Sequence, residues 1–150
     1  MKFLTYSFLS SILLFLSSTS MKMETDLLTQ YKWKNCILVV FSETNTSPLF
    51  EKQIQLFDEN IEELADRDLI IFQVFEKSGI TPNRQSISNT EITQLKERFD
   101  FNFEKNNEFA VFLVGKDGGT KLTSKNEMLN IEKLCATIDA MPMRQAEMKR

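Results

Sequence analysis

Residues 36–41 read Cys-Ile-Leu-Val-Val-Phe, an unbroken apolar run that is rich in β-branched side chains. Such a run is typical of a strand buried on both faces of a sheet. Residues 69–75 (LIIFQVF) form a second run of this kind. Between the two runs, Pro48 fits the first turn of a helix, and apolar residues recur on one helical face. The order predicts a β-α-β unit with parallel strands. The residues of the helical face are Phe50, Ile54, Phe57, Ile61 and Leu64.

The rest of the chain predicts a further helix, a hairpin and a closing helix. A Ser-x-x-Glu capping box at Ser88–Glu91 opens a helix, and residues 109–114 (FAVFLV) form a third buried strand. Lys-Asp-Gly-Gly at 116–119 predicts a tight turn, after which residues 120–123 return antiparallel. A second capping box, Ser124–Glu127, predicts the start of the last helix. The element order is β-α-β-α-β-β-α, an α/β fold with a mixed four-stranded sheet and helices on both faces.

The composition excludes several kinds of site. The 150 residues suffice for one domain, and they include no His and only two Cys. The chain therefore lacks the usual general base near neutral pH and cannot assemble an ordinary zinc site. We expect no metal and no cofactor. The net charge of −3 argues against binding to nucleic acid.

The N-terminus has the features of a secretory signal peptide. Lys2 precedes an apolar run over residues 3–16, and Ser18-x-Ser20 provides a small-x-small cleavage site. The run is shorter than the roughly 20 residues that span a bilayer, which disfavours the alternative of an uncleaved anchor. We expect cleavage after Ser20 and a secreted or periplasmic protein with no membrane span. The expected parts are a signal peptide (1–20), a lead-in segment (21–35), the domain (36–142) and a charged tail (143–150).

The stretch from Cys36 to Pro48 resembles the approach to the active site of thioredoxins. In that family, a buried strand ending in Phe is followed five residues later by Cys-Gly-Pro-Cys at a helix start. Here Phe41 is followed five residues later by Thr46-Ser-Pro-Leu49. The proline is in place, but Thr46 and Leu49 stand at the two cysteine positions. The resemblance implies a thioredoxin-like fold whose helix start has no thiol to activate.

Four longer stretches carry a second and closer resemblance: Tyr31–Asn35, Asp66–Asp68, Val114–Leu122 and Ile138–Met148. They are similar to the bacterial branch of the DUDES domain, known as domain of unknown function 4174. That family is expected to have a thioredoxin- or peroxiredoxin-like fold, and its animal relatives occur in extracellular matrix proteins. The resemblance implies the fold and export, but the family has no settled activity to carry over.

Cys36 and Cys135 leave three interpretations open. They are small hydrophobic residues of the core, or the partners of a structural disulfide in an oxidising compartment, or one of them is a reactive thiol. Neither lies at a predicted helix start, and there is no His to activate them. The sequence therefore favours the first interpretation.

Six further residues are candidates for binding. Two precede the first helix, where free N–H groups bind an anion unless the hydroxyl groups simply cap the helix. Three lie in or beside the predicted tight turn, which accounts for the aspartate better than for the lysines. One belongs to the tail motif, which suggests docking on the domain or on a partner. The candidates are Thr46, Ser47, Lys116, Asp117, Lys121 and Arg144.

These observations favour an exported, non-catalytic binding or interaction module that takes an unidentified protein or a small anionic ligand. The alternative is a peroxiredoxin-like or thiol–disulfide redox enzyme that uses Cys36 or Cys135 from a non-standard position. The absence of thiols at residues 46 and 49 favours the binding module.

Overall fold

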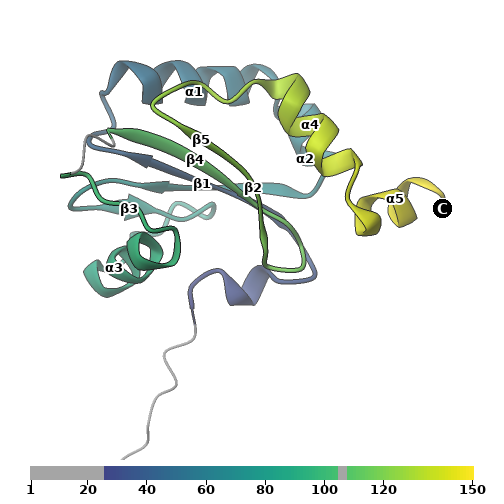
Figure 1. The fold of residues 1–150 in the computed structure, drawn as a ribbon, viewed down its shortest axis with the longest axis horizontal. Coiled ribbons are helices and arrows are strands. Elements are labelled where there is room, and N and C mark those ends of the chain that lie inside the picture. Colours follow the sequence, from purple (N-terminus) through teal and green to yellow (C-terminus); the bar gives the residue numbers. More distant parts are fainter. Residues whose placement is uncertain (1–25, 105–107) are drawn as a thin grey trace, which may run out of the picture.

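A five-stranded mixed sheet, in the order β3-β2-β1-β4-β5, forms the centre of the computed structural model, which describes residues 26–104 and 108–150 (Figure 1). The central strand β1 (Cys36–Ser42) pairs in parallel with β2 (Leu69–Val74) and antiparallel with β4 (Phe109–Val114). β5 (Thr120–Lys125) lies antiparallel to β4. The predicted signal peptide lies outside the described residues.

The sheet has five strands rather than the four predicted, because residues 76–87 contain more than a loop. β3 (Gly79–Ile80) pairs antiparallel with the end of β2 at the edge of the sheet. A strand of two residues has no hydrophobic alternation to reveal it. A Cβ at Gly79 would lie 2.9 Å from the side chain of Ile87, so glycine is what allows the chain to pack this closely.

The helices lie on both faces of the sheet, as predicted (Figure 1). α1 (Pro48–Glu59) starts at its proline, and a break at Asn60 separates it from α2 (Ile61–Ala65). The Asn60 side chain donates to the carbonyl of Leu56 at 2.8 Å, and α1 ends about two turns before the predicted limit near Arg67.

The first predicted capping box is confirmed. α3 (Asn89–Arg98) begins with the Ser88 hydroxyl accepting from the Glu91 amide, while the Glu91 carboxylate accepts from the Ser88 amide at 2.8 Å.

The second predicted capping box is wrong. Ser124 is buried within β5, and its hydroxyl donates to the carbonyl of Glu127 at 3.0 Å. The buried Gln53 side chain then ties down Leu129 through two backbone hydrogen bonds of 2.6 and 3.1 Å. α4 (Ile131–Asp139) starts only after this loop, with Asn130 as its cap. Pro142 then opens a further helix, α5 (Pro142–Met148), within the predicted tail.

Alternate residues of β1 enter two separate cores, which explains the unbroken apolar run. Ile37, Val39 and Phe41 face the layer under α3, where Phe41 stacks on Phe101 with ring centroids 4.5 Å apart. The opposite face packs against α1, α2 and α4. None of the helices in the described residues is long and apolar enough to cross a membrane.

Candidate functional site

The two ends of β1 lie at opposite edges of the sheet, and the six binding candidates divide between them. Thr46 and Ser47 follow the carboxyl end of β1, where thioredoxins carry their cysteines. Lys116, Asp117 and Lys121 follow β4, whose last residue, Val114, pairs with Ile37 near the start of β1. The structure therefore does not bring all six candidates together.

At the carboxyl end of β1, three hydroxyl side chains bond mainly with one another. The Thr44 hydroxyl lies 3.2 Å from that of Thr46 and 3.1 Å from that of Ser47. Ser47 stands at the cap position of α1, but its side chain accepts no hydrogen bond from the described helix. The predicted capping by these side chains is therefore not formed, and residues 44–47 form an uncharged, largely exposed turn next to Glu43.

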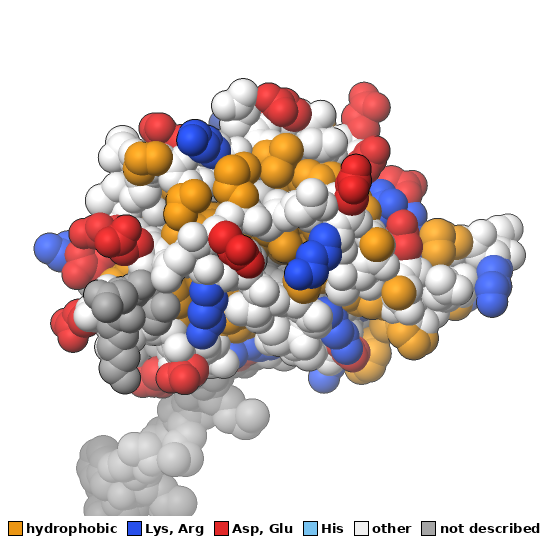
Figure 2. Space-filling view, turned by 45° about the horizontal axis from the view of Figure 1, so that its top comes forward, with side chains coloured by type: hydrophobic (Ala, Val, Ile, Leu, Met, Phe, Trp, Pro, Cys, Tyr) orange, Lys and Arg blue, Asp and Glu red, His pale blue; other side chains and the backbone are white. Residues whose placement is uncertain are grey.

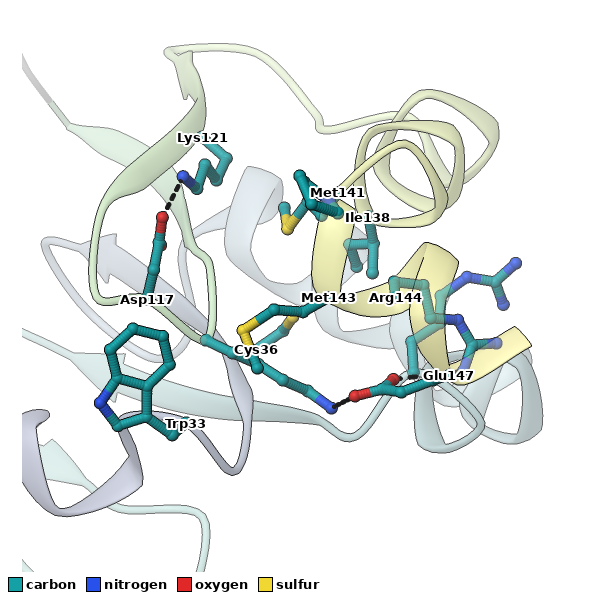
Figure 3. A pocket seen from close by; sticks show the side chains of 12 residues that line it. Trp33, Cys36, Asp117, Lys121, Ile138, Met141, Met143, Arg144 and Glu147 are labelled. Atoms are coloured by element: carbon teal, nitrogen blue, oxygen red, sulfur yellow. Dashed lines mark hydrogen bonds and ion pairs between the residues drawn. The ribbon is translucent and has the colours of Figure 1, made fainter. Parts of the chain in front are cut away.

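At the other end of β1, the four stretches Tyr31–Asn35, Asp66–Asp68, Val114–Leu122 and Ile138–Met148 meet around a cavity of about 160 Å³ (Figure 3). Trp33, Cys36 and Met143 are among its lining residues, together with Lys116 and Arg144. Figure 2 shows hydrophobic surface beside acidic and basic side chains at the α5 end of the molecule.

Lys116 is the most buried charged group of this end. Its side chain is 8% exposed, and its Nζ donates to Asp68 Oδ2 at 2.8 Å and to Glu147 Oε1 at 2.5 Å. Burial opposes the charged form, but the hydrogen bonds that the ammonium donates to the two carboxylates outweigh it and raise the pKa of Lys116. Lys116 is therefore a charged ammonium at neutral pH that links the turn to the residue before β2 and to α5.

Asp139 at the end of α4 joins two arginines. Arg67 donates to its carboxylate from Nε at 3.0 Å and from Nη2 at 2.6 Å, and Arg144 donates from Nε at 3.4 Å. The hydrogen bonds from Arg67 are the main reason that the pKa of Asp139 lies below its ordinary value. Arg144 also pairs with the Asp66 carboxylate and donates to the Asp66 carbonyl at 2.8 Å. The result is a bridge from α5 to the segment that precedes β2.

Asp117 and Lys121 belong to the hairpin turn. Asp117 accepts from the Gly119 amide at 3.0 Å and from Lys121 Nζ at 2.6 Å. Gly118 has a φ of 86°, the left-handed conformation that glycine adopts without strain. The turn therefore needs its Asp and Gly for shape, while Lys121 closes it from β5.

Cys36 and Cys135, both in the described part of the chain, are free and buried thiols. Burial is the largest effect on each and raises both pKa values. Cys135 lies within α4, with its Sγ 3.7 Å from Glu63 Oε2. Cys36 lies at the start of β1, where it lines the cavity next to Lys116. Neither thiol has the helix N-terminus that activates a cysteine.

Sequence reasoning selected Lys116, Asp117, Lys121 and Arg144 as binding candidates and Cys36 as a candidate thiol, and all five line this cavity. It did not select Trp33, Arg67 or Asp139 as site residues. All three lie in the four stretches that resemble the family, but nothing local connects these stretches with one another. Their convergence is a property of the folded chain alone.

The order β2-β1-β4-β5, with helices on both faces, defines a thioredoxin-like α/β protein. Solved structures agree. The reduced 2-Cys peroxiredoxin of Plasmodium vivax is 16% identical, with a TM-score of 0.55, and the match covers 82% of this chain and 85% of that one. Thioredoxin peroxidase I of Plasmodium yoelii is 15% identical (TM-score 0.51, 79% of each chain). AhpC of Mycobacterium tuberculosis is 14% identical (TM-score 0.51, 75% of this chain and 71% of that one). These likenesses establish the fold.

The family is established by sequence. Residues 27–147 match the family described as Domain of unknown function (DUF4174), and the chain belongs to it. No curated protein matches the chain. The matched range includes all four stretches that meet around the cavity, apart from the last residue of α5.

Proposed function

We propose that this protein is an exported, non-catalytic binding module built on a thioredoxin-like fold. One observation carries the proposal. The corner where thioredoxins hold their redox thiols contains Thr46 and Leu49, while the two cysteines of the chain are buried elsewhere. Thiol chemistry requires a thiolate that a substrate can reach, and burial works against both requirements at Cys36 and Cys135.

The cavity between Trp33 and α5 favours ligand binding as the function of this protein. Its wall combines apolar side chains with a small number of fixed charges, which is the usual construction of a ligand site. The cations Lys116, Arg67 and Arg144 are held by partners on other segments, so they are in place before any ligand arrives.

A redox enzyme that uses Cys36 is the second candidate. Cys36 lines the cavity, and both the Lys116 ammonium and the Lys116 backbone N–H favour its thiolate, although burial outweighs them. Burial raises the pKa of Cys36 and Lys116 lowers it, so the reactivity of this thiol distinguishes the two candidates.

The proposal also includes export from the cytoplasm and a place in the bacterial branch of the family. The signal-peptide features of residues 1–20 support passage out of the cytoplasm. The four quoted stretches support membership of the bacterial branch of DUDES-type domains within this family. Expression of the full chain in a bacterial host, followed by mass measurement of the periplasmic product, tests export. The expected product begins at Met21, and a product that stays in the cytoplasm with residues 1–20 attached contradicts it.

Redox activity is tested directly on the purified protein. We expect no reduction of insulin disulfides and no consumption of peroxide above buffer, and the same result for Cys36→Ser and Cys135→Ser. Both thiols should react with a chromogenic disulfide reagent only after denaturation. Turnover that disappears in one of the two serine variants would establish the redox alternative and overturn the proposal.

A further inference from the structure

We infer that the cavity between Trp33 and α5 binds a small carboxylic acid with a short apolar body, and that the Glu147 carboxylate occupies the position of the ligand carboxylate in this structure. The inference rests on the proposed binding function and names the ligand class of the same cavity. It is carried by the apolar wall, the buried Lys116 and the exposure of α5, none of whose described residues is buried.

The apolar part of the wall fits a hydrocarbon body. Figure 3 shows the Trp33 ring on one side of the cavity and Ile138 and Met141 on the other, with Met143 and Cys36 between them. Thioether side chains are flexible and polarizable, so they adapt to ligands of different shape. A volume of about 160 Å³ is close to that of an apolar cavity of about 150 Å³ that holds one benzene molecule. The body is therefore short, near the size of a five-carbon chain.

The polar part of the wall fits a carboxylate at Lys116. The ammonium is nearly buried and already holds two carboxylates, those of Asp68 and Glu147. A charge-assisted hydrogen bond in such a site is stronger than in water. Lys116 therefore provides an anchor for one negatively charged oxygen at the edge of an apolar cavity.

The charge balance requires a ligand carboxylate to replace one that is already present. Around Lys116, Arg67 and Arg144 lie four carboxylates, three of which belong to the segments that lead into β2 and out of α4. A fifth carboxylate beside three cations would be repelled. A ligand that displaces one carboxylate restores the same balance and adds its apolar body. The four carboxylates are those of Asp66, Asp68, Asp139 and Glu147.

Glu147 is the carboxylate that can leave. It lies on α5, whose seven described residues include none that is buried. Besides Lys116, polar contacts of Arg144 and of Gln145, which donates to the Asp139 carbonyl at 2.7 Å, connect α5 to the domain. Arg144, the second cation near Glu147 at 3.9 Å, lies on the same helix, so this pair does not attach α5 to the domain, whereas Asp139 is also held by Arg67 from outside its own helix. Glu147 thus acts as an internal competitor that a ligand carboxylate replaces.

Trp33 provides a built-in reporter, since it is the single tryptophan of the chain, is 61% exposed and lines the cavity. Hexanoate is the probe, and 1-hexanol is its neutral counterpart. We expect hexanoate to change Trp33 fluorescence saturably and to raise the melting temperature, with binding at least tenfold tighter than that of 1-hexanol. Glu147→Gln should tighten hexanoate binding about tenfold and leave 1-hexanol unchanged.

Lys116→Met should weaken hexanoate binding at least tenfold. The matched controls are Lys77→Met, at the opposite end of the sheet, and Glu97→Gln, on α3, and both should bind hexanoate as the parent does. Because Lys116 is buried, its variant is checked by circular dichroism. If Lys116→Met does not fold, the result for Glu147→Gln decides the test. This second substitution lies on α5, which has no buried residue, and we expect it to leave the fold intact.

Three outcomes would overturn the inference. They are the absence of saturable hexanoate binding, equal binding of hexanoate and 1-hexanol, and hexanoate binding that Glu147→Gln leaves unchanged or weakens. None of these outcomes affects the proposed function, which fails only if the redox assays show cysteine-dependent turnover. The two failures are therefore distinguishable.

Discussion

The two ends of β1 present opposite chemistry on one strand. At the carboxyl end, Thr44, Thr46 and Ser47 form an exposed turn of neutral hydroxyl groups. At the amino end, buried and half-buried charges from four segments surround an apolar cavity. In a thioredoxin the reactive group would lie at the carboxyl end. In this protein that end has no thiol, and the ion pairs of Lys116 and Asp139 lie at the other.

The two ends of β1 differ in how much they depend on partners from other segments of the chain. Neutral hydroxyl groups in water need no particular partner, so the Thr46 turn imposes little on the surrounding chain. Removing a charge from water is unfavourable without a partner, so the buried Lys116 and the half-buried Asp139 need oppositely charged groups from other segments beside them. The arrangement at the amino end therefore depends on the whole fold, and three changes test the comparison.

The largest expected effect is from Phe41→Ala, near the carboxyl end of β1. Phe41 is fully buried and contacts the rings of Phe99, Phe101 and Phe112. We expect a loss of about 3 to 5 kcal/mol in the free energy of unfolding, since a phenyl-sized cavity remains. Urea unfolding at low and high salt measures it. Packing, not charge, supports this end, so the loss should not depend on salt, and a loss below about 1 kcal/mol would contradict this view.

A smaller effect is expected from Asp139→Asn at the charged end. The pKa of Asp139 lies below its ordinary value of 3.8, first because of Arg67. The unfolded chain therefore takes up the proton at a higher pH than the folded protein does. The stabilisation is complete above pH 3.8 and is lost as the pH falls through the lower folded value. We expect a loss of about 1 to 2 kcal/mol at pH 7.

Urea unfolding between pH 2 and pH 7 measures this effect. Stability of Asp139→Asn should fall less steeply than that of the parent below pH 3.8. The control is Asp58→Asn, an exposed aspartate of α1, which should follow the parent curve. Parallel curves for the parent and Asp139→Asn would show that Asp139 does not stabilise this end.

The smallest expected effect is on the pKa of a thiol placed at residue 46, the position that corresponds to a thioredoxin cysteine. In a background of Cys36→Ser and Cys135→Ser, Thr46→Cys places a thiol beside the start of α1. We expect its pKa to fall about half a unit to one unit below the ordinary value, because the helix N-terminus favours the thiolate. The pH dependence of alkylation measures the pKa. Thr93→Cys, within α3, is the control, and equal pKa values in the two variants would show that this corner no longer activates a thiol.

Local patterns in the sequence predicted the elements that local physics controls. The buried strand at 36–41, the Asp-Gly turn and the Ser88 capping box each depend on neighbours within a few residues, and the structure contains all three. The same kind of pattern was misleading at Ser124, because pairing with β4 carries β5 on to Lys125. No local pattern predicted β3, because its two residues form a strand only by pairing with the free edge of β2.

The sequence by itself determined what chemistry is missing, since a chain without His and with Thr46 and Leu49 at the thiol positions has no ordinary redox corner. It also determined where the central strands lie, because their apolar runs are stable only in the interior of the protein. Only the tertiary structure decided where the charges meet. Lys116 is 48 residues from Asp68 and 31 from Glu147, and Arg144 is 78 from Asp66. Such partners are brought together by packing of the whole sheet, because the attraction between them is too weak in water to select them along an unfolded chain.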